Sequence, residues 1–112
     1  MVLPSAALMM PLLVAAATGL EGAIQAALAD AAHRTGLPAS SITLVKAEAV
    51  TWPDGSLGCP QPGMNYTMAL VPGYRVELRA DSRALDYHAG AHGALVLCPP
   101  GNSVEPVQDS RS

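Results

Sequence analysis

The sequence predicts an α+β domain in which one N-terminal helix packs on a four- to five-stranded, mainly antiparallel sheet. A first segment repeats apolar residues at helical spacing, from Leu20 to Ala31. The later segments alternate apolar and polar residues with the period of a strand, and polar or glycine-bearing turns separate them. One helix laid across a face of such a sheet is the economical way to cover that face.

The domain is expected to span residues 18–98, between an apolar leader and a polar tail. Residues 1–17 end in three alanines, a small-residue pattern typical of signal-peptide cleavage. This run is short for a membrane span, which needs ~20 apolar residues, so no stable membrane insertion is expected. Because no Lys or Arg precedes the run, a mis-assigned start and an ordinary apolar first helix stay open as alternatives. Residues 99–112 carry prolines and few apolar side chains, which predicts a disordered tail.

The helix is predicted to cover residues 19–35. Thr18 and Glu21 have the spacing of a capping box, in which each side chain bonds a free backbone N–H of the first turn. At the other end, Gly36 is followed by Leu37 and Pro38, a combination that stops a helix.

Five segments have strand character. The clearest begins at Tyr74, where apolar residues alternate with Arg75, Glu77 and Arg79, so that one face is apolar and the other solvated. Pro72 and Gly73 predict a bend or bulge just before it. The predicted strands are residues 41–51, 66–70, 74–79, 84–88 and 94–98.

The loop from Trp52 to Gly63 contains three prolines and three glycines, and therefore follows one particular path. Asp54 is expected to accept backbone hydrogen bonds within a turn. Trp52 is interpreted as a partly buried anchor whose indole N–H finds a backbone acceptor, with an exposed recognition residue as the alternative. Leu57 is expected to be an exposed apolar residue at the tip of the loop.

Cys59 and Cys98 are the only cysteines, and a disulfide between them is the favoured interpretation in an exported chain. The alternative is a Cys59 nucleophile activated by His88 or His92. His88 and His92 are four residues apart and Asp86 could join them on a metal. That spacing brings ligands together only in a helix, and the intervening glycine predicts a turn, so no metal is predicted.

The charge pattern argues against nucleic acid as a partner. The formal net charge is −3, and the basic residues are interspersed with acidic ones and form no basic stripe. Neutralising phosphates requires clustered Lys and Arg. No cofactor is predicted, since no complete cofactor or catalytic signature is present.

Four sequence features carry a resemblance to a known group of proteins. They are TWPDGSLGCPQPG, the GYRVEL strand from Gly73, DYH at residues 86–88 and a closing cysteine after an apolar strand. These features resemble a family of small exported bacterial proteins of unknown function, and the resemblance covers residues 42–98. It implies a short antiparallel sheet with the tryptophan and the loop at one end, and it implies no catalytic residues.

The function predicted from these observations is a non-catalytic binding or structural module, secreted or periplasmic, with an unknown protein or peptide partner. Its contact surface is expected at the loop from Trp52 to Gly63. The first alternative is a peptidase inhibitor with Leu57 as its specificity residue, because a disulfide-braced loop is preorganised for a protease cleft. The second is a small hydrolase or metal-binding protein that uses Cys59, Asp86, His88 and His92. The candidate binding residues are Trp52, Asp54, Leu57, Tyr87 and His88.

Overall fold

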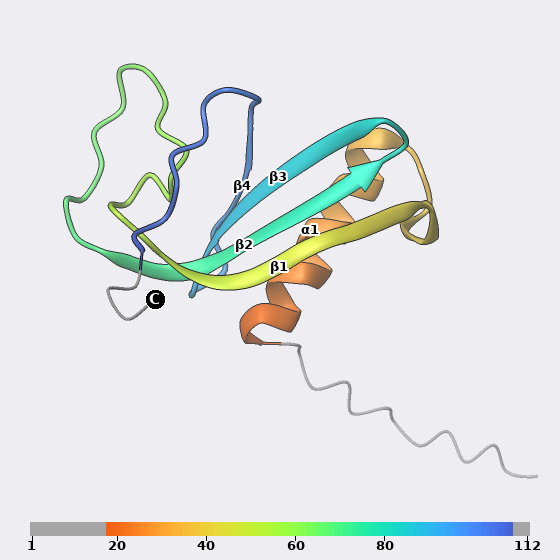
Figure 1. Ribbon diagram of the computed structural model, residues 1–112, viewed down its shortest axis with the longest axis horizontal. Coiled ribbons are helices and arrows are strands. Elements are labelled where there is room, and N and C mark those ends of the chain that lie inside the picture. The colour runs from red at the N-terminus through yellow and green to blue at the C-terminus, as the bar shows by residue number, and fades with distance from the viewer. Residues whose placement is uncertain (1–17, 109–112) are drawn as a thin grey trace, which may run out of the picture.

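The computed structural model describes residues 18–108 and confirms the predicted α+β architecture. One helix lies along one face of a sheet, and two irregular segments run side by side at the left of Figure 1. The elements are α1 (Gly19–Thr35), the 3₁₀ turn η1 (Ala39–Ser41), β1 (Ile42–Trp52), β2 (Val71–Ala80), β3 (Arg83–Gly90) and β4 (Leu95–Cys98).

The four strands form a meander in the order β1-β2-β3-β4, and every neighbouring pair is antiparallel. Its register puts Val76 of β2 opposite Ala47 of β1 and Tyr87 of β3. A bulge between Leu44 and Lys46 interrupts the pairing of β1. Because side chains alternate between the faces of a strand, this register sends one set of side chains toward α1 and the other set away from it.

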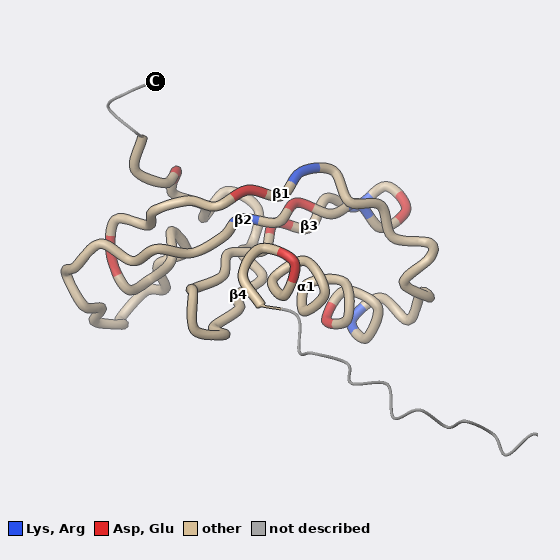
Figure 2. The backbone as a smooth tube through the Cα atoms, turned by 90° about the horizontal axis from the view of Figure 1, so that it is seen from below, with Lys and Arg blue, Asp and Glu red and all other residues tan. Residues whose placement is uncertain are grey.

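The face toward α1 holds the main core. The helix contributes Ala23, Ala27 and Ala31, which are buried, while the large side chains come from the sheet. Alanine lets the helix approach the strands closely, so that residues such as Val76 and Tyr87 are fully buried beneath it. Figure 2, turned by 90°, shows α1 on one side of the strands.

The helix occupies the predicted residues, but its first turn differs from the prediction. Thr18 is the N-cap residue and makes no side-chain capping hydrogen bond, so the predicted capping box with Glu21 is wrong. The C-terminal prediction is confirmed. Gly36 adopts the left-handed conformation with φ of 75°, and its N–H donates to Ala32 O at 2.9 Å.

Residues 66–70, predicted as a strand, belong to a loop instead. These residues pair with no strand of the sheet, and the strand that pairs with β1 is β2, which begins after them at Val71. One backbone bond, from Gly55 N–H to Thr67 O at 2.8 Å, ties this stretch to the first half of the loop. The predicted bend at Pro72 and Gly73 is also absent, because β2 begins at Val71 and continues through both residues.

Residues 99–108 follow a defined path, unlike the predicted disordered tail. Val104 N–H donates to Gly58 O and Val107 N–H donates to Thr51 O, each at 2.8 Å. The Asn102 amide donates to Pro60 O at 2.6 Å. The composition of residues 99–108 predicted disorder, but their backbone and polar groups form hydrogen bonds with the loop and with β1. The predicted signal peptide (residues 1–17) and the last part of the tail (residues 109–112) lie outside the described residues.

None of the helices within residues 18–108 combines the length and the apolar character that a membrane crossing requires.

Candidate functional site

The predicted disulfide is present and fastens the long loop to the end of the sheet. Cys59 and Cys98 are bonded, with their Cα atoms 5.6 Å apart, and both are buried. A thiolate nucleophile at Cys59, which the hydrolase alternative requires, does not exist in this disulfide-bonded form.

Trp52 is an anchor, as the sequence predicted, and it is fully rather than partly buried. Its side chain has no exposed surface, and its indole N–H donates to Ala89 O at 3.0 Å. The ring stacks on His88, with centroids 4.3 Å apart and planes inclined by 17°. This burial removes Trp52 from any contact surface, so the alternative of an exposed recognition residue is wrong.

Two glycines make room for the Trp52 ring. A Cβ on Gly58 would lie 2.6 Å from two ring carbons of Trp52, and Gly58 also has a positive φ of 70°. A Cβ on Gly73 would collide with the carbonyl oxygen of Ala89. Only residues without a side chain fit at these positions, so part of the glycine content of the loop region has a packing role.

His88 lies beneath the loop with both ring nitrogens occupied. Nδ1 lies 2.6 Å from Leu57 O, a group that only accepts, so Nδ1 carries a proton and donates. Nε2 lies 3.0 Å from Asp86 Oδ2 and 3.3 Å from Ser103 Oγ. These contacts join β3 to the loop through Leu57 and to the tail through Ser103, which suits an anchor for both segments.

Asp86 is the centre of an ion-pair network on the same face. The Arg75 guanidinium donates to both of its carboxylate oxygens, each at 3.1 Å. Partial burial alone would raise the pKa of Asp86, but hydrogen bonds from His88 and Arg75 outweigh that cost and hold the pKa below its usual range. The same bidentate bond raises the pKa of Arg75. Arg75 also donates to Glu105 at 3.0 Å, which links the tail to the sheet.

The structure corrects the prediction for Leu57 and supports the one for Asp54. Leu57 is buried, with 7% of its surface exposed, and its φ is 57°. It is therefore not the exposed tip residue that the inhibitor alternative needs. Asp54 accepts from the Ser56 N–H at 2.8 Å and from the Ser56 hydroxyl at 2.6 Å, and these bonds lower the pKa of Asp54. It shapes a turn, as expected.

Tyr87 points the other way, into the core beneath α1. It is fully buried, and its hydroxyl donates to Asp30 of the helix at 2.7 Å. Burial, together with this hydrogen bond to a carboxylate, raises the pKa of Tyr87. Tyr87 and His88, both predicted as binding residues, thus lie on opposite faces of β3, and the five predicted binding residues form no common surface.

His92 is exposed in the turn between β3 and β4, apart from the buried His88. Across residues 18–108 no group of three or more His, Cys, Asp or Glu side chains is arranged to hold a metal ion.

The exposed part of the long loop is its second half, residues 61–70, which we call the methionine loop. Met64 is 61% exposed, Met68 89% and Leu70 63%. Residues 55–74 contain no charged side chain, and the loop end of the molecule is largely tan at the left of Figure 2. Sequence reasoning missed this surface because it assigned residues 66–70 to a strand; the available signal was the run of uncharged residues around two methionines.

A hydrogen bond within the methionine loop fixes its shape. The Gln61 N–H donates to the Tyr66 hydroxyl at 3.0 Å, and Tyr66 is the one partly covered residue in a stretch that is otherwise exposed. Large apolar side chains exposed together on an ordered loop are typical of a contact surface.

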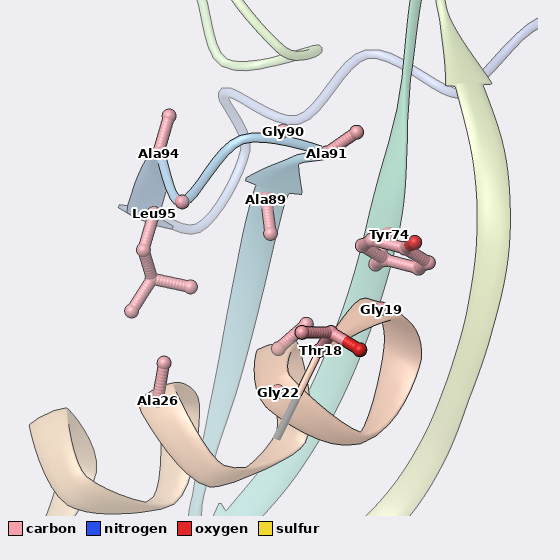
Figure 3. Close-up of a pocket in the computed structure, with 12 residues that line it drawn as sticks. Thr18, Gly19, Gly22, Ala26, Tyr74, Ala89, Gly90, Ala91, Ala94 and Leu95 are labelled. Atoms are coloured by element: carbon pink, nitrogen blue, oxygen red, sulfur yellow. The ribbon is translucent and has the colours of Figure 1, made fainter. Parts of the chain in front are cut away.

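A cavity of about 270 Å³ lies between the first turns of α1 and the turn after β3 (Figure 3). Glycines and alanines line most of it, and Thr18 and Tyr74 supply its polar side chains. Small-molecule sites combine an apolar wall with several convergent polar groups. None of the predicted site residues lines this cavity.

Comparison with known proteins places the chain in a family. The profile described as "Domain of unknown function (DUF8738)" matches residues 24–98. The chain belongs to this family. A comparison with curated proteins gives no match, and a comparison with solved structures gives none either.

The DUF8738 match lies entirely within residues 18–108. It contains the four strands, both halves of the long loop and both cysteines, and it ends at Cys98, before the tail that covers His88. A family of unknown function is what the sequence resemblance implied.

Proposed function

We propose that this DUF8738 domain is an exported, non-catalytic binding module, secreted or periplasmic, that contacts a protein partner through the methionine loop. The exposure of Met68, 89% of its surface, carries this proposal. The predicted contact surface thereby moves from residues 52–63 to residues 61–70, because the first half of the loop is occupied in anchoring.

The anchored first half of the loop holds the exposed second half in place. Trp52, Leu57 and Cys59 fasten the first half to the sheet, so the second half is presented from a rigid base. A preorganised surface loses little conformational entropy when it binds. Methionine adapts its shape to a partner, and fully burying a side chain of this size contributes roughly 1.5–3 kcal/mol.

An apolar protein surface is the partner chemistry that fits. The methionine loop has no Lys or Arg to attract phosphates, so neither nucleic acid nor an anionic lipid surface is favoured. A partner with an uncharged groove would bury Met64, Met68 and Leu70 without leaving a charge unpaired.

Export is proposed from the disulfide together with the apolar leader. A buried disulfide in a small domain is typical of proteins folded in an oxidising compartment. Mass spectrometry of the protein recovered from outside the cytoplasm should report a mature N-terminus near Thr18 and an intact Cys59–Cys98 bond. An intact Met1 with two free thiols would contradict the proposed export.

The binding role can be tested by site-specific photocrosslinking in the cells that produce the protein. A photoreactive side chain at position 68 should yield one discrete adduct, and the double substitution Met64→Ser, Leu70→Ser should abolish it. The matched control is position 45, where Val45 is also exposed (57%) but lies on β1. No adduct at position 68, or equal labelling at both positions, would contradict the proposal.

The hydrolase alternative makes a different prediction for Cys59. A nucleophile would react with an alkylating reagent in the native protein, whereas the bonded cysteine should react only after a reductant is added. Alkylation followed by peptide mapping distinguishes the two.

A further inference from the structure

A second cavity, of about 530 Å³, lies where the end of α1 meets the edge of the sheet. Leu85 of β3 and Leu97 of β4 form apolar parts of its lining, and Pro99 and Pro100 border it where the chain leaves β4. Arg34 of α1 and Arg83 of β3 are its two charged lining residues. The volume falls within the range of about 300–1,000 Å³ that small-molecule sites occupy.

The two arginines differ in how far their charge is neutralised. Arg34 is paired through its Nε with Asp30, whose carboxylate also accepts from Tyr87. Arg83 has no carboxylate within ion-pair distance among residues 18–108. The cavity therefore carries one uncompensated positive charge, at Arg83, above an apolar lining.

We propose that this cavity binds a monocarboxylate that carries an unbranched apolar chain, such as a medium-chain fatty acid. The carboxylate pairs with the Arg83 guanidinium, whose planar fork matches two carboxylate oxygens. Arg34 lines the same cavity, and the apolar chain covers Leu85 and Leu97. A dianion such as a phosphate monoester fits less well, because only one positive charge is free to meet it.

This site is independent of the methionine loop. It shares no lining residue with residues 61–70, and its ligand is recognised by charge and an apolar chain rather than by a protein surface. Failure of either proposal leaves the other intact.

The test is titration calorimetry of the disulfide-bonded protein with decanoate, and with 1-decanol as the uncharged analogue of similar length. Decanoate should bind, and decanol should bind about tenfold more weakly, because a charge-assisted pair contributes on the order of a factor of ten. Arg83→Gln should weaken decanoate binding by about the same factor and leave decanol unchanged.

The matched control is Arg79→Gln. Arg79 is exposed on β2, near the same end of the sheet, and does not line the cavity. Its substitution should leave decanoate binding unchanged. Backbone amide shifts on titration should be largest at Leu85 and Leu97, which shows the location independently of affinity.

Three results would overturn the proposal: no decanoate binding, equal affinity for decanoate and decanol, or equal loss of binding in the Arg79→Gln and Arg83→Gln variants. Both arginines are exposed, so neither substitution should prevent folding, and a thermal unfolding curve of each variant verifies this.

Discussion

The two faces of the sheet are covered in different ways. On one face a continuous helix buries Ala23, Ala27 and Ala31 against apolar strand residues, and its backbone hydrogen bonds are formed within the helix itself. On the other face irregular segments, residues 53–70 and 99–108, cover one end of the sheet. Irregular backbone must find partners for its polar groups, so this face needs hydrogen bonds, ion pairs and a disulfide. This need explains why the ion pair of Asp86 with Arg75 and the hydrogen bonds of His88 lie on the loop face.

Removing the disulfide is expected to have the largest effect on the stability of the loop-covered face. The double substitution Cys59→Ser, Cys98→Ser should lower the free energy of unfolding by about 4 kcal/mol, because the bond closes a loop of 39 residues. Urea unfolding followed by Trp52 fluorescence measures it. Reduced wild-type protein is the control and should behave like the double variant. An unchanged midpoint would show that the loop face is stable without the bond.

The packing of Trp52 is tested by Gly73→Ala. A Cβ at this position collides with backbone of β3, so the substitution should cost roughly 3 kcal/mol or prevent folding. Gly90→Ala is the matched control, since its Cβ would meet ordinary contacts, the nearest at 3.6 Å from Ala94. Its cost should stay within about 1 kcal/mol. Thermal unfolding compares the two, and similar losses would contradict the packing role of Gly73.

The ion-pair network predicts how stability depends on pH. Because the folded state lowers the pKa of Asp86, its contribution is present above the unfolded value of about 3.9 and is lost as the pH falls through the lower folded value. Asp86→Asn should cost about 2 kcal/mol at neutral pH, less than breaking a fully buried pair, because the carboxylate is 24% exposed.

The wild-type protein should lose stability as the pH falls below about 4. The Asp86→Asn variant should lose less stability over the same pH range, because it has no carboxylate to protonate at this position. The control is Asp81→Asn in the exposed turn after β2, where asparagine also tolerates the positive φ of 56°. Urea midpoints measured from pH 2 to pH 7 check this. An acid dependence equal to that of the wild type in the Asp86→Asn variant would contradict the assignment.

The smallest effect is expected from Glu105→Gln. Glu105 pairs with Arg75, but its side chain is 75% exposed, and exposed ion pairs contribute less than about 1 kcal/mol. Stability should change by about 0.5 kcal/mol or less, and high salt should remove the difference between variant and wild type. A larger loss would mean that the tail is held mainly by this pair rather than by its backbone hydrogen bonds.

Local patterns predicted the helix-covered face well. The 3.6-residue repeat of apolar residues and the stop signal at Gly36 located α1. The alternation of apolar and polar residues around Val76 located β2, because every second side chain of that strand packs into the core. The same rules failed at residues 66–70, whose composition suits a strand but which pair with none of the four strands. They also failed at Thr18, where a capping box was compatible with the sequence and did not form.

The candidate site was less predictable than the fold. The disulfide and the role of Trp52 followed from residue type and context, because a tryptophan in a proline-braced loop buries readily and needs one acceptor. The burial of Leu57 and the exposure of Met68 did not follow, since both are apolar loop residues and only the path of the backbone separates them.

The sequence by itself determined the class of the fold, the extent of α1, the position of the first strand and the pairing of the two cysteines. The fold class, the helix and the strand depend on periodicity, which acts over short stretches of chain. The pairing of the cysteines depends on their number, because each of the two has one possible partner. Only the tertiary structure decided that the tail lies against the loop, that His88 and Tyr87 face opposite sides of β3, and that the exposed apolar surface is residues 61–70. Those features depend on which distant segments share a face, and contacts between residues far apart in the chain leave no periodic signal in the sequence.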